Sequence, residues 1–103
     1  MRKGTFVLEE IWEVIGDRLA RPAPGSYVGG LVHGEKGIDR VLEKVGEEAT
    51  EFVISVKNGE KDRIVEEAAD LQFHLLVALR AAGVELELVM EELASRRKPP
   101  LSR

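Results

Sequence analysis

The sequence predicts an all-α fold, a helical bundle of about five helices that is completed across a homodimer interface. Apolar residues recur at helical spacing in several segments, and Asn58-Gly59 is a helix-stopping pair between the two longest of them. The helices on either side of this pair also carry apolar side chains on second faces, at Ile54, Phe73 and Val77. A chain of 103 residues has few elements with which to cover those faces, so we expect a second copy to do so.

The first helix is expected at about residues 6–20. Thr5 can cap its N-terminus, apolar residues then recur at helical spacing, and Pro22 follows its end. Trp12 lies on the apolar stripe of this helix. A tryptophan in that position is more often part of the core or of a subunit interface, and stacking on an adenine base is the alternative.

A short second helix is expected after the connector at 21–25. Ser26 can cap it, and it should run to Leu31 or Val32 before a glycine-rich loop. No strand precedes this loop, so it lacks the context of a dinucleotide-binding or Walker-type phosphate loop. Three side chains nearby can touch a substrate, although solvent exposure is the more common role at such positions: Tyr27, His33 and Lys36.

Two long helices, at about 38–57 and 61–82, form the predicted hairpin. We expect the first to turn inward Ile38, Val41, Leu42, Val45, Ala49, Phe52 and Val56, and the second Ile64, Ala68, Leu71, Leu75 and Leu79. The predicted hairpin, which also carries the acidic residues of a predicted metal site, therefore spans about 38–82.

Gly83 ends the hairpin, and a last helix is expected at about 85–97. Its inward residues should be Leu86, Val89, Met90 and Leu93. Pro99-Pro100 should stop it and leave a C-terminal tail at about 98–103. Basic residues at the end of this helix suit its C-terminus electrostatically, and binding of substrate phosphates is the alternative: Arg96, Arg97 and Lys98.

Acidic residues lie on both sides of the hairpin turn. Glu51 and Glu67 each lie eight residues from Gly59, and Glu48 and Asp70 each lie eleven residues from it. In two antiparallel helices, residues equally far from the turn lie opposite each other, so Glu51 would face Glu67 and Glu48 would face Asp70. At about 1.5 Å of rise per residue, both pairs would lie roughly 12 to 17 Å from the turn. Glu47, next to this set, should point more towards solvent.

Four of these carboxylates border the apolar face and are predicted to bind a metal: Glu48, Glu51, Glu67 and Asp70. Burial and like charge both raise carboxylate pKa values and oppose folding, and a divalent cation removes that conflict. Oxygen ligands and the absence of cysteine indicate a hard ion, Mg²⁺ or else Mn²⁺, rather than Zn²⁺. The alternative is a solvated acidic face, which is the common role of any single glutamate in such helices.

Other polar residues flank the predicted groove. Four cations can bind substrate phosphates, namely Lys44, Lys57, Lys61 and Arg63. Lys57 and Lys61 lie at a helix end, where lysines commonly serve as solubilising charge. Glu47 or an unligated acid can accept a proton from water. His74 lies one turn beyond Asp70 and can hydrogen-bond to it and orient it. The alternative is a core histidine whose ring nitrogens have hydrogen-bond partners but which has no role at the site.

The segments K-V-G-E-E-A-T-E at 44–51 and E-E-A-A-D-L-x-x-H-L-L at 66–76 resemble phosphoribosyl-ATP pyrophosphohydrolase of histidine biosynthesis. That family belongs to the all-α nucleoside-triphosphate pyrophosphohydrolases, which share the pattern E-E-x-x-E and E-x-x-D. Ser26-Tyr27 adds to the resemblance, which covers roughly residues 6–95. The loop before the hairpin departs from it, being about two residues longer, with His33–Lys36 as the insertion.

The resemblance implies a reaction and a set of catalytic residues. It implies Mg²⁺-dependent hydrolysis of phosphoribosyl-ATP, between the α- and β-phosphates, to phosphoribosyl-AMP and pyrophosphate. Mg²⁺ held by the acids can neutralise the triphosphate and lower the pKa of a bound water. The catalytic set is then Glu47, Glu48, Glu51, Glu67 and Asp70.

Three alternatives remain at this point. A housecleaning pyrophosphohydrolase acting on free nucleotides would use the same acids. A di-iron carboxylate bundle would pair Glu with His at i,i+3, whereas here Glu48 is followed by Glu51 and Glu67 by Asp70. A non-catalytic helical interaction module would explain the amphipathic helices but not acids placed symmetrically about the turn.

Length, charge and composition limit the remaining classes. The chain is expected to be a single domain, 1–103, because it is short and shows no repeats or linkers. A net charge of −4 gives no reason to expect a nucleic-acid or membrane-surface partner. The absence of cysteine fits a reducing compartment. Acids interrupt any N-terminal apolar leader, and no apolar run reaches membrane-spanning length, so we expect a cytoplasmic protein.

Overall fold

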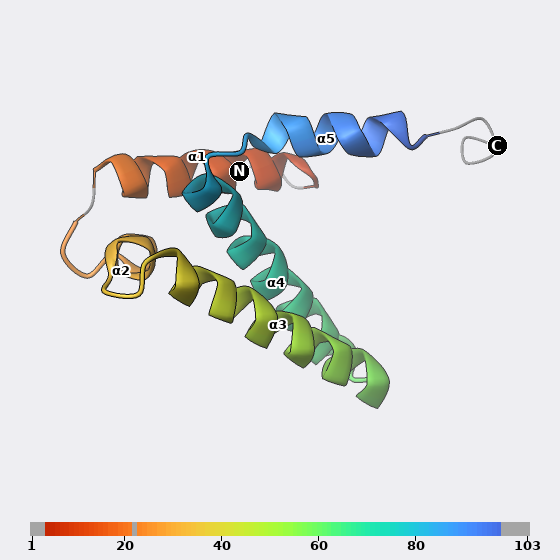
Figure 1. Ribbon diagram of the computed structural model, residues 1–103. Coiled ribbons are helices and arrows are strands. Elements are labelled where there is room, and N and C mark those ends of the chain that lie inside the picture. Colours follow the sequence, from red (N-terminus) through yellow and green to blue (C-terminus); the bar gives the residue numbers. More distant parts are fainter. Residues whose placement is uncertain (1–3, 22, 98–103) are drawn as a thin grey trace.

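The computed structural model describes residues 4–21 and 23–97, and within these ranges it contains five α-helices and no strand (Figure 1). In chain order the helices are α1 (Phe6–Ala20), α2 (Tyr27–His33), α3 (Ile38–Asn58), α4 (Lys61–Ala82) and α5 (Leu86–Ser95). The predicted all-helical class is therefore confirmed. Pro22, the Pro99-Pro100 stop and the expected tail at 98–103 lie outside the described residues. None of the described helices combines the length and the apolar character needed to cross a membrane.

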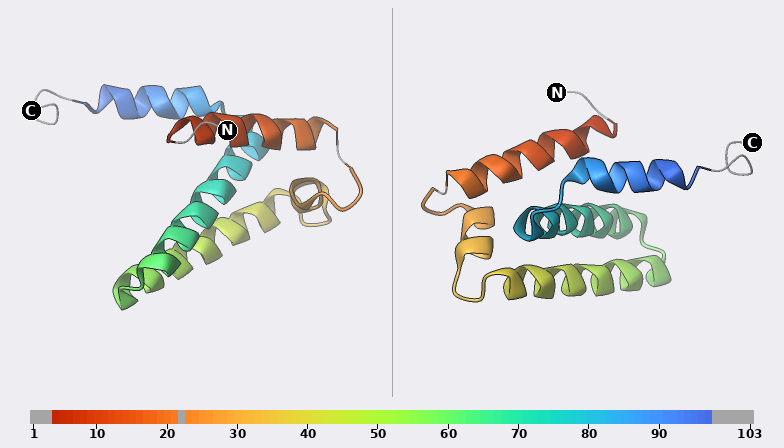
Figure 2. Two further views of the ribbon diagram at one scale, coloured as in Figure 1. Left: turned by 180° about the vertical axis from the view of Figure 1, so that it is seen from behind. Right: turned by 45° about the horizontal axis from the view of Figure 1, so that its top comes forward.

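Helices α3 and α4 form the predicted hairpin and share the most extensive contact in the described structure. They run antiparallel and side by side in both Figure 1 and Figure 2. The turn is made by Gly59, whose φ of 72° lies in the left-handed region and whose N–H donates to the carbonyls of Ser55 and Val56. Glycine adopts this conformation without the steric penalty that a side chain would bring, so the helix ends where the sequence predicted.

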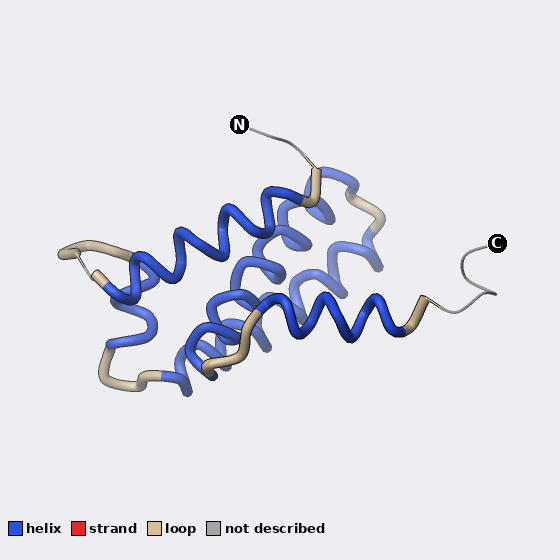
Figure 3. The backbone as a smooth tube through the Cα atoms, turned by 90° about the horizontal axis from the view of Figure 1, so that it is seen from above, coloured by secondary structure: helices blue, strands red, loops and turns tan. Residues whose placement is uncertain are grey.

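The N-terminal helices lie at the end of this hairpin opposite its turn (Figure 1), and Figure 3 shows the same arrangement from above. The hydroxyl of Ser26 accepts a hydrogen bond from the Gly29 N–H at 3.1 Å, so the predicted cap of α2 is confirmed. The predicted cap of α1 is wrong. Thr5 has helical dihedral angles, φ −67° and ψ −13°, and its side chain makes no cap hydrogen bond. A cap residue needs extended dihedrals to aim its oxygen back at the first turn.

The apolar core lies where α1, α2, α3, the C-terminal half of α4 and the first residue of α5 meet. Its buried members are Trp12, Ile15, Val28, Leu31, Val41, Leu76, Val77 and Leu86. The Trp12 ring lies in this core, under the guanidinium of Arg80 at 4.0 Å. Arg80 also donates to the Trp12 carbonyl at 2.9 Å. The expectation that Trp12 packs in the core is confirmed.

Two predicted inward faces are wrong in detail. On α3, three residues of the predicted inward face are exposed, namely Ile38, Leu42 and Val56, whereas Glu48 and Ser55 are buried. On α4, Leu75 of the predicted inward face is exposed. Val77, which we expected a second copy to cover, is 0% exposed, because α1 of the same chain packs on that side of α4. Ile54, in contrast, is 53% exposed, as expected.

Helix α5 leaves the end of α4 and extends away from the hairpin (Figure 1). Leu86 is buried, but Met90 and Leu93 are exposed, so the expected inward face of this helix is only partly covered. The helix spans a shorter range than the predicted 85–97. The chain bends away at Gly83, whose φ of 73° ends α4 and directs α5 off the bundle.

Candidate metal centre

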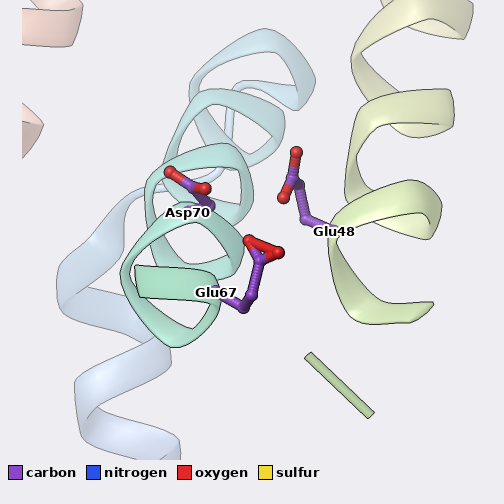
Figure 4. Close-up of side chains that lie close together, drawn as sticks. All are labelled: Glu48, Glu67 and Asp70. Carbon is purple, nitrogen blue, oxygen red and sulfur yellow. The ribbon is translucent and has the colours of Figure 1, made fainter. Parts of the chain in front are cut away.

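Three carboxylates from the two hairpin helices meet in the groove between α3 and α4 (Figure 4). Glu48 comes from α3, and Glu67 and Asp70 come from α4. Each offers a carboxylate oxygen, and the three oxygens all lie within 4.8 Å of one another. We call these residues the acidic cluster. The structure thus brings together three of the four residues predicted as metal ligands, from segments separated by the whole hairpin turn.

Helical periodicity on α3 explains why a carboxylate is buried here. Val41, Glu48 and Ser55 follow one another at intervals of seven residues, or about two turns, and all three are buried. On α4 the same interval separates Glu67 from His74, which is also buried. The exposed fractions of Glu48 and Glu67 are 6% and 4%. The polar stripes are therefore the surfaces along which the two helices pack.

The electrostatics of the cluster oppose full ionisation. Burial raises the pKa of the Glu67 carboxyl above its ordinary value, and the charge of Glu51 raises it further. Arg63 acts in the opposite direction, through an ion pair with Glu67 at 2.9 Å. The pKa of Glu67 nevertheless stays above its ordinary value, so the ion pair with Arg63 does not offset the effects of burial and of the neighbouring acids.

Only one of the two carboxylate oxygens of Glu48 has a partner among the described residues. Its Oε1 lies 3.3 Å from the Lys44 ammonium, while its Oε2 is buried with no hydrogen-bond partner in the described part of the chain. Burial acts to lower the pKa of Lys44, but the hydrogen bond to Glu48 and the nearby negative charges leave that pKa raised. A buried carboxylate oxygen without a partner is unfavourable, and a ligating cation is one way to satisfy it. Oxygen donors from three carboxylates suit a hard divalent ion such as Mg²⁺ or Mn²⁺.

Glu51 and Glu47 lie outside the cluster. Glu51 is exposed, although its charge reaches Glu67. It lies at the margin of the groove, where it lines a hollow of about 190 Å³ together with Ser55 and Arg63. Glu47 is exposed as expected and pairs with Arg40 at 3.3 Å and with Lys44 at 3.5 Å.

The four predicted phosphate-binding cations fall into two groups. Lys44 and Arg63 lie at the cluster, where each pairs with one of its buried acids. Lys57 and Lys61 are exposed at the turn end of the hairpin. Lys57 lies nine residues from Glu48, a rise of about 13 Å along the helix. The structure therefore places only Lys44 and Arg63, of these four, beside the acids.

His74 links the cluster to α2 through a residue whose role sequence reasoning missed. Its Nδ1 lies 2.8 Å from the main-chain carbonyl of Asp70, and its Nε2 lies 2.8 Å from the hydroxyl of Tyr27. A carbonyl can only accept, so Nδ1 carries the hydrogen and Nε2 accepts from the Tyr27 O–H. The predicted contact with Asp70 forms, but with its backbone, and the imidazole is a satisfied buried group. Tyr27 is 47 positions away in sequence, so no local pattern could have paired the two residues.

A helical hairpin carrying E-E-x-x-E on one helix and E-x-x-D on the other, with acids of both gathered in its groove, is the pattern of the all-α nucleoside-triphosphate pyrophosphohydrolases. Within this class, the family model for phosphoribosyl-ATP pyrophosphohydrolase matches residues 8–97. The chain belongs to the phosphoribosyl-ATP pyrophosphohydrolase family, as the resemblance of its two motifs predicted.

Relatives of known name agree with this assignment. The phosphoribosyl-ATP pyrophosphatase of Methanosphaerula palustris is 64% identical over 94 residues, which are 91% of this chain and 95% of that protein. The phosphoribosyl-ATP pyrophosphatase of Methanoculleus marisnigri is 55% identical over 92 residues, 89% of this chain and 95% of that protein. The histidine biosynthesis bifunctional protein HisIE of Thermoanaerobacter pseudethanolicus is 49% identical over 86 residues, 84% of this chain but 39% of that longer protein.

Proposed function

We propose that this protein hydrolyses phosphoribosyl-ATP to phosphoribosyl-AMP and pyrophosphate in histidine biosynthesis. Family membership supports the reaction, and one observation in the structure supports the site: three carboxylate oxygens lie within 4.8 Å of one another between α3 and α4, where Glu48 and Glu67 are buried and Asp70 is exposed. In this proposal Glu48, Glu67 and Asp70 hold Mg²⁺, for which Mn²⁺ can substitute, and Glu51 completes the set from the groove margin. The buried, unpartnered Oε2 of Glu48 fits a ligand role.

Mg²⁺ held by these acids would supply positive charge to the triphosphate and activate a water for attack. Side chains of the protein would bind the phosphates and accept the proton. Lys44 and Arg63 pair with Glu48 and Glu67 before substrate binds, and both can turn to the phosphates once the acids have another partner. Glu47 is exposed beside them and can accept the proton of the attacking water. The water oxygen bonds to the α-phosphorus while the bond from that phosphorus to the oxygen bridging the α- and β-phosphates breaks, and pyrophosphate leaves.

We also propose that the active form is a cytoplasmic homodimer of single-domain chains. Exposed apolar side chains gather on the hairpin: Leu42, Val53, Ile54, Val56 and Val65. Apolar surface of this kind on two neighbouring helices is typical of an interface, and a second copy that packs there would complete a helical bundle. Sedimentation equilibrium at micromolar concentration tests this proposal, because a mass near the 11.4 kDa of one chain would contradict it.

The decisive experiment compares substrates. Pyrophosphatase-coupled phosphate release should be measured with phosphoribosyl-ATP, ATP, dUTP and dCTP, each with Mg²⁺ and with EDTA. We expect rapid, Mg²⁺-dependent turnover of phosphoribosyl-ATP and a kcat/KM at least about 100-fold lower for the three free nucleotides, since they lack the phosphoribosyl group. Comparable turnover of a free nucleotide would instead indicate a housecleaning pyrophosphohydrolase.

A further inference from the structure

A second hollow lies beside the acidic cluster, between the first turns of α1 and the middle of α4. Its volume is about 610 Å³. It is lined by Gly4, Thr5, Val7, Leu8 and Ile11 on the α1 side and by Ala69, Asp70, Gln72, Phe73 and Leu76 on α4. Figure 1 shows α1 crossing the C-terminal part of α4 and diverging from it towards its own N-terminus. The hollow occupies the wedge that this divergence leaves.

Asp70 belongs to both the hollow and the acidic cluster. Ala69, Phe73 and Leu76 recur at helical intervals of four and three residues and form the face of α4 that borders the hollow. Asp70 follows Ala69 and lies at the edge between this face and the one that carries Glu67. A ligand that filled the hollow would therefore end within reach of the proposed metal ligands.

The charges around the hollow indicate which part of a ligand it accepts. Among the described residues that line the hollow, most side chains are apolar, Asp70 is the one charged group, and none is basic. Phosphate groups would meet no basic partner among these residues, whereas a flat, neutral ring would bury its faces against Leu8 and Phe73. Thr5, whose hydroxyl makes no cap hydrogen bond, and Gln72 can hydrogen-bond to the edges of such a ring.

We propose that this hollow, here called the base pocket, binds the adenine base of the substrate while the triphosphate passes Asp70 to the acidic cluster. The proposal rests on the proposed function, because it assigns the neutral part of that substrate. A volume of about 610 Å³ lies within the usual range of about 300 to 1,000 Å³ for small-molecule sites, and such sites are mostly apolar with a few polar groups. Continuity with the acids favours a nucleotide over a second copy of the chain.

Binding measurements test the base pocket without relying on turnover. Ala69→Phe should fill the pocket, and Ala20→Phe, at the exposed far end of α1, is the matched control. Isothermal titration in Mg²⁺ should use phosphoribosyl-AMP, which carries the base, and pyrophosphate, which does not. We expect Ala69→Phe to weaken phosphoribosyl-AMP binding at least about 10-fold, as steric changes in apolar pockets do, and to leave pyrophosphate binding within about twofold. The control should bind both ligands like the wild type.

A milder variant guards against misfolding. Gln72→Leu keeps the size of an exposed side chain and removes its amide, so phosphoribosyl-AMP binding should weaken about 3- to 10-fold with no change in the melting temperature. Unchanged phosphoribosyl-AMP binding in both variants would overturn the proposal. A changed sedimentation mass in Ala69→Phe with unchanged phosphoribosyl-AMP binding would also overturn it, because a second copy would then occupy the hollow. Absence of phosphoribosyl-ATP turnover in the wild type would refute the proposed function but not the base pocket.

Discussion

The two halves of α4 differ in what they bury. Its N-terminal part, Lys61 to His74 and here called the polar half, buries Glu67 and His74 on the sides that face α3 and α2. The Glu67 carboxylate pairs with Arg63 and lies in one cluster with Glu48, whose Oε2 is buried without a hydrogen-bond partner among the described residues. The C-terminal half buries Leu76 and Val77 against α1, and its one nearby cation, Arg80, donates to a carbonyl and lies over an aromatic ring. One half therefore has the charge and incomplete pairing of a binding site, while the other has the satisfied apolar packing of a core.

This difference indicates how a small protein maintains an acidic site. Buried carboxylates are unfavourable in the absence of a counterion, so they must be offset by packing elsewhere on the same helix. The apolar half of α4, with α1 across it, supplies that packing and holds the other half in place. We expect changes in the apolar half to lower stability and changes in the polar half to lower activity.

The largest effect on stability is expected in the apolar half. Ile15 is fully buried against this part of the core, so Ile15→Ala should lower the free energy of unfolding by about 2 to 5 kcal/mol. Val14→Ala, at the exposed neighbouring position, should change it by less than about 0.5 kcal/mol. Urea titrations followed by circular dichroism measure both values. Equal losses in the two variants would mean that α1 does not pack on α4 as described.

The largest effect on activity is expected in the polar half and across its groove. Glu48→Gln, Glu51→Gln, Glu67→Gln and Asp70→Asn should each reduce Mg²⁺-dependent turnover at least about 100-fold, because each removes a proposed ligand. Glu66→Gln is the matched control, since this exposed glutamate also pairs with Arg63 but is not part of the cluster. The variants should remain folded by circular dichroism. Near-wild-type turnover in any two of them at saturating Mg²⁺ would refute the proposed site.

A smaller effect is expected where the two halves join. Tyr27→Phe removes the hydroxyl that donates to the buried His74 Nε2, and an unsatisfied buried acceptor costs about 1 to 3 kcal/mol of stability. The change should appear as a lower urea midpoint with an unchanged m-value. Because His74 also holds the Asp70 carbonyl, the affinity for Mg²⁺ should fall as well. An unaltered midpoint would mean that solvent replaces the tyrosine hydroxyl.

The smallest effect is a pH-dependent response to metal. Glu67 has a raised pKa, so the folded state without metal binds more protons than the unfolded state. That contribution favours folding below the unfolded pKa and is lost as pH rises through the folded pKa. Mg²⁺ competes with these protons, so it should raise the melting temperature more at pH 8 than at pH 5. At a given pH, each tenfold rise of the Mg²⁺ concentration above its Kd adds about 1.4 kcal/mol to the free energy of unfolding.

Thermal melts with EDTA and with millimolar Mg²⁺ at the two pH values measure this response. Lys44 and Glu48 from α3 and Arg63 from α4 face the same groove, so the Glu67→Gln variant serves to isolate the contribution of Glu67. An equal Mg²⁺ increment at pH 5 and pH 8 in the wild type would mean that the carboxylates do not form one coupled site.

Local sequence determined the helices and the pairing of the acids. Ser26 caps α2, and Gly59 and Gly83 end α3 and α4 in left-handed conformations, because these effects depend on residues within one turn of each position. The equal spacing of Glu48 and Asp70 from the turn placed them at the same level of an antiparallel hairpin. The two motifs also sufficed to indicate the family.

Tertiary structure alone decided which face of each helix is buried. Periodicity gave α3 an apolar stripe with Leu42 and Val56, yet α4 packs on the stripe that carries Glu48 and Ser55. The same is true of the hydrogen bond between Tyr27 and His74 and of the base pocket between α1 and α4. A helix's faces follow from its own residues, but which face is covered depends on the neighbour that packs there, and those contacts join residues far apart in the chain.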